Sequence, residues 1–352
     1  MTEMDYQSKK VLYSVDKLFD TLYIDLNLTD TVYDDFPIYS LEKIKIDDFE
    51  HENQLLKQFR NEIESNLNKL HVNTQYSEEH ASWSVFYAFK EILDQILSAV
   101  PEEYTPYYRE QAGDWTLQPT IFREGTSGYS NDFRKSYEHV YKDIAQKYPE
   151  DVAYFAPDDK KHQDDRAANL AELQHYGLGT PLIDISENPF ISLLFMVDGY
   201  ARGNEPQLDV FFVRNDGKNT LFQQVMKKAQ NRRIAAQKGA FLNFDRWDGN
   251  ELEKVMPRLC IRLKYKPNLL KETDNSIFPD GENKNSSSYQ EDLRNKALET
   301  AVNDIKNKLN SYYYRTEDLF PDFYMYLGII KRKYSDDSNL KDNSKWYQVS
   351  DK

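Results

Sequence analysis

The sequence has a single cysteine, Cys260, in 352 residues, so no disulfide can form within the chain. A lone cysteine of this kind is more often a small buried side chain than a reactive thiol. The longest strongly apolar stretch, residues 190–197, is far shorter than the roughly 20 residues that span a bilayer. Residues 1–10 lack the basic and then apolar pattern of a secretory signal. We therefore expect a cytoplasmic protein in a reducing compartment.

Positive charge is scarce. The chain has 45 Lys and Arg residues against 59 Asp and Glu residues, a formal net charge of −14. Such a negative field repels phosphate backbones and anionic lipid, which disfavours generic nucleic-acid or membrane binding. A local basic cluster could override it, and the best candidate is formed by Lys227, Lys228, Arg232 and Arg233.

Several catalytic and metal-binding motifs are missing. The sequence has no GxxxxGK[ST], GxSxG, HExxH or CxxC pattern, which removes the usual phosphate loop, nucleophile elbow and zinc motifs. The histidines are scattered singly, so no metal is expected. They are His51, His71, His80, His139, His162 and His175.

What the chain does contain is enough apolar material for a core, with 39% hydrophobic residues, among them 26 Tyr, 19 Phe and 4 Trp. Apolar residues recur at three- and four-residue steps in residues 49–72, and residues 82–100 repeat this helical pattern up to Pro101. Residues 1–50 alternate short apolar and acidic runs, and we expect irregular structure there with one or two short strands. Residues 1–115 are thus predicted to be a mainly helical N-terminal region.

Beyond residue 116 strands and helices mix without regular alternation, which favours an α+β fold with a mixed sheet and surrounding helices. Asp164 or Asp165 can cap a helix that Gly177 ends, and Asn188 before Pro189 begins a buried helix. The polar residues 266–292 are predicted to be a mobile loop, and residues 336–352 a polar tail. Strands are expected at 117–124, 180–186, 208–214, 240–244 and 257–265, and helices at 131–148, about 165–176, 188–199, 293–309 and within 319–331.

Several local motifs then follow one another in a specific order. They are Ile121-Phe122-Arg123-Glu124-Gly125, the run LQHYGLGTPLID at 173–184, Asn188-Pro189, RIAAQKGAF at 233–241 and LFPD at 319–322. This order resembles the FRG domain family, named for its Phe/Tyr-Arg-Gly motif, over residues 116–333, and we place the domain at 116–335. Two departures stand out: Glu124 separates Arg123 from Gly125, and Pro181 stands where relatives commonly carry arginine.

The resemblance implies a bacterial protein of antiphage or toxin-like context, with a phage component or an antitoxin as partner. Its target, a protein or a nucleic acid, stays open. A strand ending in Arg, a strand ending in Ser before an apolar helix and a later Gln-containing strand is also the order found in ADP-ribosyltransferases, which implies an NAD cofactor. The implied residues are Arg123, Tyr176, Ser186 and Arg233 for cofactor binding and His175, Asp184 and Gln237 for catalysis.

Each of these residues also has a plainer interpretation. Arg123 could simply pair with Asp184 or Glu124, His175 could be a structural histidine at a helix end, and Tyr176 could be a packing aromatic. Asp184 could cap the turn that follows it, and Gln237 could mark only a turn. A non-catalytic ligand-sensing or protein-interaction module is therefore the alternative function. A metal-dependent nuclease using Asp184 is a third, but no paired acidic motif with ligand spacing supports it.

Overall fold

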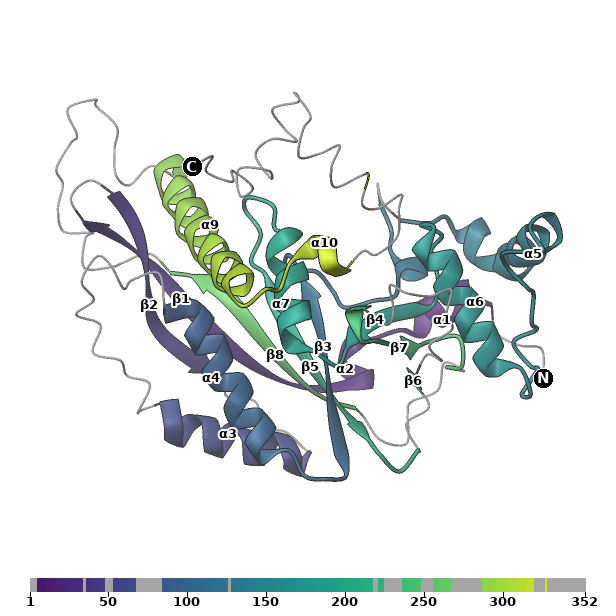
Figure 1. The fold of residues 1–352 in the computed structure, drawn as a ribbon, viewed down its shortest axis with the longest axis horizontal. Helices are drawn as coiled ribbons and strands as arrows, with labels where there is room; N and C mark the ends of the chain where they lie inside the picture. Colours follow the sequence, from purple (N-terminus) through teal and green to yellow (C-terminus); the bar gives the residue numbers. More distant parts are fainter. Residues whose placement is uncertain are drawn as a thin grey trace.

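The computed structural model describes residues 5–33, 36–47, 53–67, 84–125, 128–217, 221–224, 236–247, 256–266, 287–319 and 327. Their strands form one mixed sheet of eight, in the order β2-β1-β8-β5-β3-β4-β7-β6 (Figure 1). The expected α+β class with a mixed sheet and surrounding helices is thereby confirmed, while an ADP-ribosyltransferase-like arrangement stays a prediction. The strands are β1 (Phe19–Tyr33), β2 (Phe36–Ile46), β3 (Tyr104–Gln111), β4 (Leu182–Ser186), β5 (Gln207–Arg214), β6 (Phe222–Gln224), β7 (Gly239–Asn243) and β8 (Met256–Tyr265).

The first strands are long, not short as the sequence pattern suggested. β1 alternates apolar and polar residues, and its Leu22, Ile24, Leu26 and Leu28 are fully buried, because the period of two places them all on one face. β1 runs parallel to β8 from Phe19 opposite Met256 onward. The boundary expected at residue 116 therefore falls within one continuous sheet, to which residues on both sides contribute strands.

Helices cover the sheet in two groups. Figure 1 shows α3, α4, α7 and α9 beside β1, β8 and β5, and α1, α5 and α6 gathered near β4, β7 and β6. Each group packs around its own buried apolar cluster. The bounds are α1 (Tyr6–Leu12), α2 (Val15–Leu18), α3 (Gln54–Leu67), α4 (Ser84–Ala99), α5 (Asn131–Lys147), α6 (Gln163–His175), α7 (Pro189–Asp198), α9 (Ser287–Ser311) and α10 (Thr316–Leu319).

Helix ends follow local sequence signals closely. The Asn188 side chain accepts a hydrogen bond from the Phe190 amide at the start of α7, as the Asn-Pro pair predicted. Gly177 adopts a φ of +90° just after α6, which is the left-handed conformation expected of a helix-ending glycine. The predicted caps of α6 were wrong, since His162 is the capping position and Asp164 and Asp165 lie in the first turn.

The expected mobile loop at 266–292 and the expected last helix within 319–331 are only partly within the described residues. Residues 287–292 were expected in the mobile loop, but they begin α9 because its helical pattern extends upstream of residue 293. Residues 267–286 of that loop and the polar tail 336–352 lie outside the described residues. Of the last helix expected within 319–331, the described part is Leu319 at the end of α10 and residue 327.

The strand expected at 117–124 is also absent from this described segment. Thr120–Phe122 form a 3₁₀ turn, with Pro119 as the preceding residue. Proline has no amide hydrogen to give to a ladder, and the Phe122 amide bonds back to the Pro119 carbonyl at 3.0 Å. Arg123 therefore follows a turn. The strand that carries an arginine in this region is β3, which the sequence analysis did not predict.

Candidate functional site

The sheet is held most weakly between β3 and β4. The pairing of β3 with β5 runs from Tyr104 opposite Arg214 to Gln111 opposite Gln207. In contrast, β3 and β4, both fully described, are paired at one position, Tyr108 opposite Ser186. Because so little ladder joins the two strands, side chains from nearby loops and from α6 can reach this joint.

Arg109 is the residue of β3 that follows the paired position. Its Nη1 donates a hydrogen bond of 2.7 Å to the backbone carbonyl oxygen of Asp184. Its Nε is buried and has no hydrogen-bond partner within the described part of the chain. The guanidinium is thus anchored at one nitrogen and makes no hydrogen bond to a carboxylate of the described residues, so its charge is not neutralised by direct contact.

Arg123 reaches the same place from the turn after Thr120–Phe122. Its guanidinium is half-buried and makes no hydrogen bond or ion pair with the residues that the structure describes. Burial lowers the pKa of Arg123, the charge of Arg109 lowers it further, and the Asp184 carboxylate opposes both effects. The two arginines and Asp184 therefore lie within electrostatic range of one another.

Asp184 is held by the end of α6. Its Oδ2 accepts a hydrogen bond of 2.7 Å from Gln174 Nε2, and the Gln174 side-chain oxygen accepts one from the Thr180 hydroxyl. Asp184 is exposed on β4 even though its strand neighbours are buried.

The charges at this joint do not cancel. Asp209, directly opposite Arg109 on β5, is fully buried, and its Oδ1 accepts bonds of 3.0 and 2.7 Å from Arg258. This buried pair neutralises itself. Arg109 and Arg123 are left with Asp184 and the carboxyl group of Glu110 as nearby acidic side chains.

Glu110 adds a titratable carboxyl next to Arg109 in the chain. Burial raises the pKa of Glu110 to about 7, Arg109 opposes this rise, and Asp184 and Asp209 add to it. Near neutral pH this carboxyl is about half protonated. It therefore offsets the two arginines only in part.

His175 and Tyr176 follow Gln174 at the C-terminal end of α6. The helical turn directs Gln174 to Asp184, while His175 Nδ1 is 4.0 Å from Glu172 Oε1. The His175 and Tyr176 rings are 5.1 Å apart, and Tyr176 is 76% exposed. Their roles at a ligand stay predictions.

Ser186 and Gln237 are brought together at the far end of β4. Ser186 Oγ donates a bond of 2.8 Å to the Gln237 carbonyl oxygen. Gln237 Nε2 donates one of 3.2 Å to the Leu319 carbonyl oxygen, so this amide is held towards α10. Arg233 lies outside the described residues. The catalytic role of Gln237 and the cofactor role of Ser186 likewise stay predictions.

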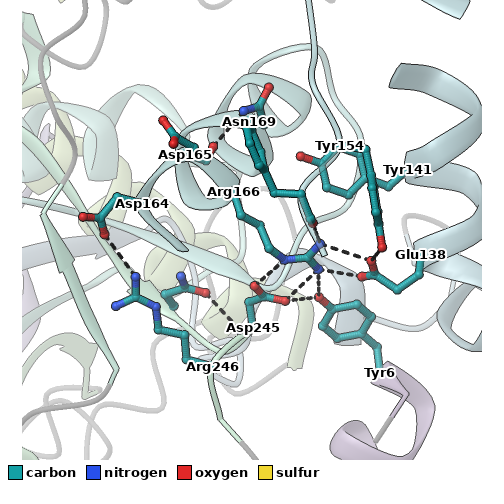
Figure 2. Close-up of polar contacts among 12 residues, drawn as sticks. Tyr6, Glu138, Tyr141, Tyr154, Asp164, Asp165, Arg166, Asn169, Asp245 and Arg246 are labelled. Atoms are coloured by element: carbon teal, nitrogen blue, oxygen red, sulfur yellow. Dashed lines mark hydrogen bonds and ion pairs between the residues drawn. The ribbon is translucent and has the colours of Figure 1, made fainter. Parts of the chain in front are cut away.

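A second polar cluster, shown in Figure 2, surrounds Arg166. Arg166 is 1% exposed and bonds to Asp245 (Nε to Oδ2, 2.7 Å) and Glu138 (Nη2 to Oε1, 2.6 Å). Burial opposes ionisation of Asp245, but the hydrogen bonds and charge of Arg166 outweigh it, so the pKa of Asp245 lies below its usual range. Because donors and acceptors here satisfy one another, we assign this cluster a structural role.

Two further observations bear on the site. Among the described residues, no group of three or more His, Cys, Asp or Glu side chains is placed to hold a metal ion. No helix in the described ranges is both long and apolar enough to cross a membrane.

Sequence analysis missed Arg109, although a signal was present. The tripeptide Tyr108-Arg109-Glu110 repeats the aromatic-Arg-Glu pattern of Phe122-Arg123-Glu124, and the fold brings the two arginines within electrostatic range of each other. In each copy a glutamate follows the arginine where the family motif has glycine. The chain therefore offers two candidates for the aromatic-Arg motif of the family, one at Arg109 and one at Arg123.

The family model of the FRG domain matches residues 105–205, which begin in β3 and extend past α7. The match starts before the expected residue 116 and ends well before residue 333, so it includes both arginines and Asp184 and excludes Gln237. The comparisons with curated proteins and with solved structures found no match. The expected resemblance is thus confirmed over residues 105–205, which match the FRG domain family.

Proposed function

We propose that this FRG-domain protein is an ADP-ribosyltransferase-like effector, of the toxin type found in bacterial antiphage defence, that binds an NAD-type cofactor through Arg109 and Arg123. The observation that carries the proposal is the convergence of these two arginines on the joint between β3 and β4. Asp184 is the carboxylate within electrostatic range of both.

The chemistry of the joint suits a phosphate-bearing ligand. The Arg109 guanidinium donates one hydrogen bond to a backbone carbonyl oxygen, and the Arg123 guanidinium donates none to the described residues. A guanidinium presents several N–H donors in a rigid plane, which matches two oxygens of one phosphate. A pyrophosphate, with its two phosphates joined, would neutralise both arginines together. The partly protonated Glu110 would repel it less than a full negative charge would.

The order of the elements supports the transferase reading of this ligand. β3 carries Arg109, β4 ends in Ser186 two residues before α7 begins, and Gln237 precedes β7. These three strands are neighbours in the sheet. In ADP-ribosyltransferase chemistry a first-strand residue holds the dinucleotide, and a later acidic or amide group steadies the ribose as positive charge develops. Arg109 and Arg123 would take the first role and the Gln237 amide oxygen the second. His175 and Tyr176 would border the pocket, and Asp184 would orient the arginines.

A second function, non-catalytic sensing of the same ligand, is favoured by one observation. Gln237 is uncharged, and its amide nitrogen already donates to the Leu319 carbonyl oxygen. An amide stabilises a developing cation less than a carboxylate does. Binding without turnover would be the behaviour of such a sensor.

The test is to titrate the purified full-length chain with NAD by calorimetry and to follow nicotinamide release by chromatography. Arg109→Ala and Arg123→Ala should each weaken NAD binding by about tenfold to a hundredfold, which corresponds to the loss of a hydrogen bond to a charged group. The lysine replacements should restore binding only in part, because an ammonium keeps the charge without the planar fork. Since Arg123 is half-buried and lacks a carboxylate contact, its removal should leave the melting temperature nearly unchanged.

The matched control is Arg214→Ala, because Arg214 lies at the other end of the β3 and β5 pairing and bonds to Asp216. It should bind NAD as the parent does. Absence of NAD binding by the parent, or unchanged binding by both site variants, would overturn the proposal. NAD binding without nicotinamide release under any condition would replace the transferase with the sensor.

A further inference from the structure

Four polar side chains of helix α1 form hydrogen bonds or ion pairs with residues far along the chain. The Tyr6 hydroxyl donates to Asp245 Oδ1, and Lys9 Nζ donates to the Asp245 carbonyl oxygen at 2.7 Å. Gln7 Oε1 accepts a bond of 2.6 Å from Arg134 Nε, and Lys10 forms an ion pair with Glu124. Tyr6 and Lys9 are both buried. Two of these contacts are therefore made with Asp245 and two with the segment around Arg123.

Arg134 is the residue that transmits this tie to Arg123. It is 1% exposed, and its Nη1 donates to the carbonyl oxygens of Tyr129, Ile121 and Arg123, at 2.6, 3.3 and 3.4 Å. One guanidinium thus gathers carbonyls from both sides of the turn that carries Arg123. Gln7 fixes the Nε corner of that guanidinium, and Lys10 holds Glu124, the residue after Arg123.

We propose that α1 is a strap that positions Arg123, so that the seating of α1 and anion binding at Arg123 are coupled. The ligand in this inference rests on the proposed function, but the positioning of the Arg123 turn does not. Gln7, Lys10 and Arg134 act through the turn and touch no ligand, so they are positioning residues. Coupling of this kind is reciprocal: ligand at Arg123 must tighten α1 by the factor by which α1 tightens the ligand.

The strap is suited to detach locally. α1 has seven residues, and a helix shorter than about 12 residues is marginal by itself in water. Its helical state therefore depends on its tertiary contacts, which are the four polar contacts and the packing of the buried Tyr6 ring against Tyr137. Segments of this kind open at lower cost than the core around them, which would let the Arg123 turn loosen while the sheet stays intact.

The experiment uses the full chain with Gln7→Ala, Lys10→Ala and the double variant, and Lys17→Ala as control. Lys17 is exposed on α2, so its loss removes the same charge from the N-terminal segment without touching the turn. Amide hydrogen exchange is measured without ligand at Arg123 and Tyr129, whose amides bond to the carbonyls of Thr120 and Arg123. The double variant should exchange about tenfold faster there, as expected for the loss of one or two modest contacts, while β5 and β8 stay unchanged.

NAD affinity and exchange within α1 complete the test. The double variant should bind NAD about threefold to tenfold more weakly than the parent, and NAD should slow exchange across residues 6–12 of the parent. Unchanged exchange at Arg123 and Tyr129 in the double variant would overturn the proposal that α1 positions Arg123, whatever the NAD affinities are. If the parent binds no NAD, the proposed function fails while this exchange result still decides the strap. If the double variant does not fold, the Lys10→Ala variant alone gives the same decision.

Discussion

Replacing Asp245 with asparagine should destabilise the protein far more than the same change at a neighbouring exposed carboxylate. Asp245 is 8% exposed and accepts two hydrogen bonds from Arg166, of 2.7 Å from Nε and 3.0 Å from Nη2. It also accepts from the Tyr6 hydroxyl, and burial together with Asp245 raises the pKa of Tyr6, so that this hydroxyl stays a donor. Figure 2 shows these contacts converging on the Asp245 carboxylate.

The magnitude follows from the buried geometry. Asparagine keeps the shape of aspartate but leaves the 1% exposed Arg166 with Glu138 as its remaining carboxylate. Removing one partner of a buried pair typically costs about 3–5 kcal/mol. Unfolding entropy of about 2.1 cal/mol/K per residue gives about 0.7 kcal/mol/K for a 352-residue chain that melts as one unit. A loss of about 4 kcal/mol should therefore lower the melting temperature by about 5 °C.

The same variant should change the response to acid. The folded-state pKa of Asp245 lies below its ordinary value, so its contribution to stability is complete above the unfolded pKa of about 3.9 and is lost as the pH falls through the folded pKa. The asparagine variant has no such proton to bind. The difference in unfolding free energy between parent and variant should therefore narrow as the pH is lowered below about 4.

The assay is thermal and denaturant unfolding followed by circular dichroism at several pH values. Asp164→Asn is the matched control. Asp164 forms an ion pair with Arg246 in the same region, and its side chain is 65% exposed. Exposed ion pairs contribute about 0–1 kcal/mol, so this control should melt within about 1 °C of the parent. Equal melting temperatures for the two asparagine variants would refute the reasoning that Asp245 is a buried, paired carboxylate.

Two further predictions concern the core. Leu194→Ala should lower the free energy of unfolding by about 2–5 kcal/mol in denaturant unfolding, because Leu194 is fully buried in α7. Phe195→Ala should lower it by less, because Phe195 is only half-buried. An unchanged unfolding midpoint for Leu194→Ala would contradict a buried α7. Cys260 is fully buried, and burial raises the pKa of its thiol. A thiol reagent at pH 8 should therefore modify it only after denaturant is added. Rapid labelling of the native protein would show that this part of β8 is accessible to solvent.

Local sequence signals determined most of the helices and central strands. These signals act through contacts within a few residues, so they specify local structure without reference to the rest of the fold. Examples are the Asn188-Pro189 pair, the left-handed Gly177 and the apolar periodicity of α4. The ordered motifs from Phe122 to Asp184 were likewise sufficient to identify the FRG family, because a family resemblance depends on residue order and not on contacts.

Tertiary structure alone decided where the charges meet. Arg109 lies on a strand and Arg123 follows a turn. Neither periodicity nor spacing reveals that β3 and β4 pair at one position, that Arg109 bonds to the Asp184 carbonyl oxygen, or that Arg123 lies within electrostatic range of Asp184. Pairing between distant strands depends on which edges are available after the helices pack, and the same holds for the joining of β1 to β8. The tie from Gln7 to Arg134 spans more than a hundred residues. Contacts at such separation arise only when the folded chain brings their partners together, so no local pattern encodes them.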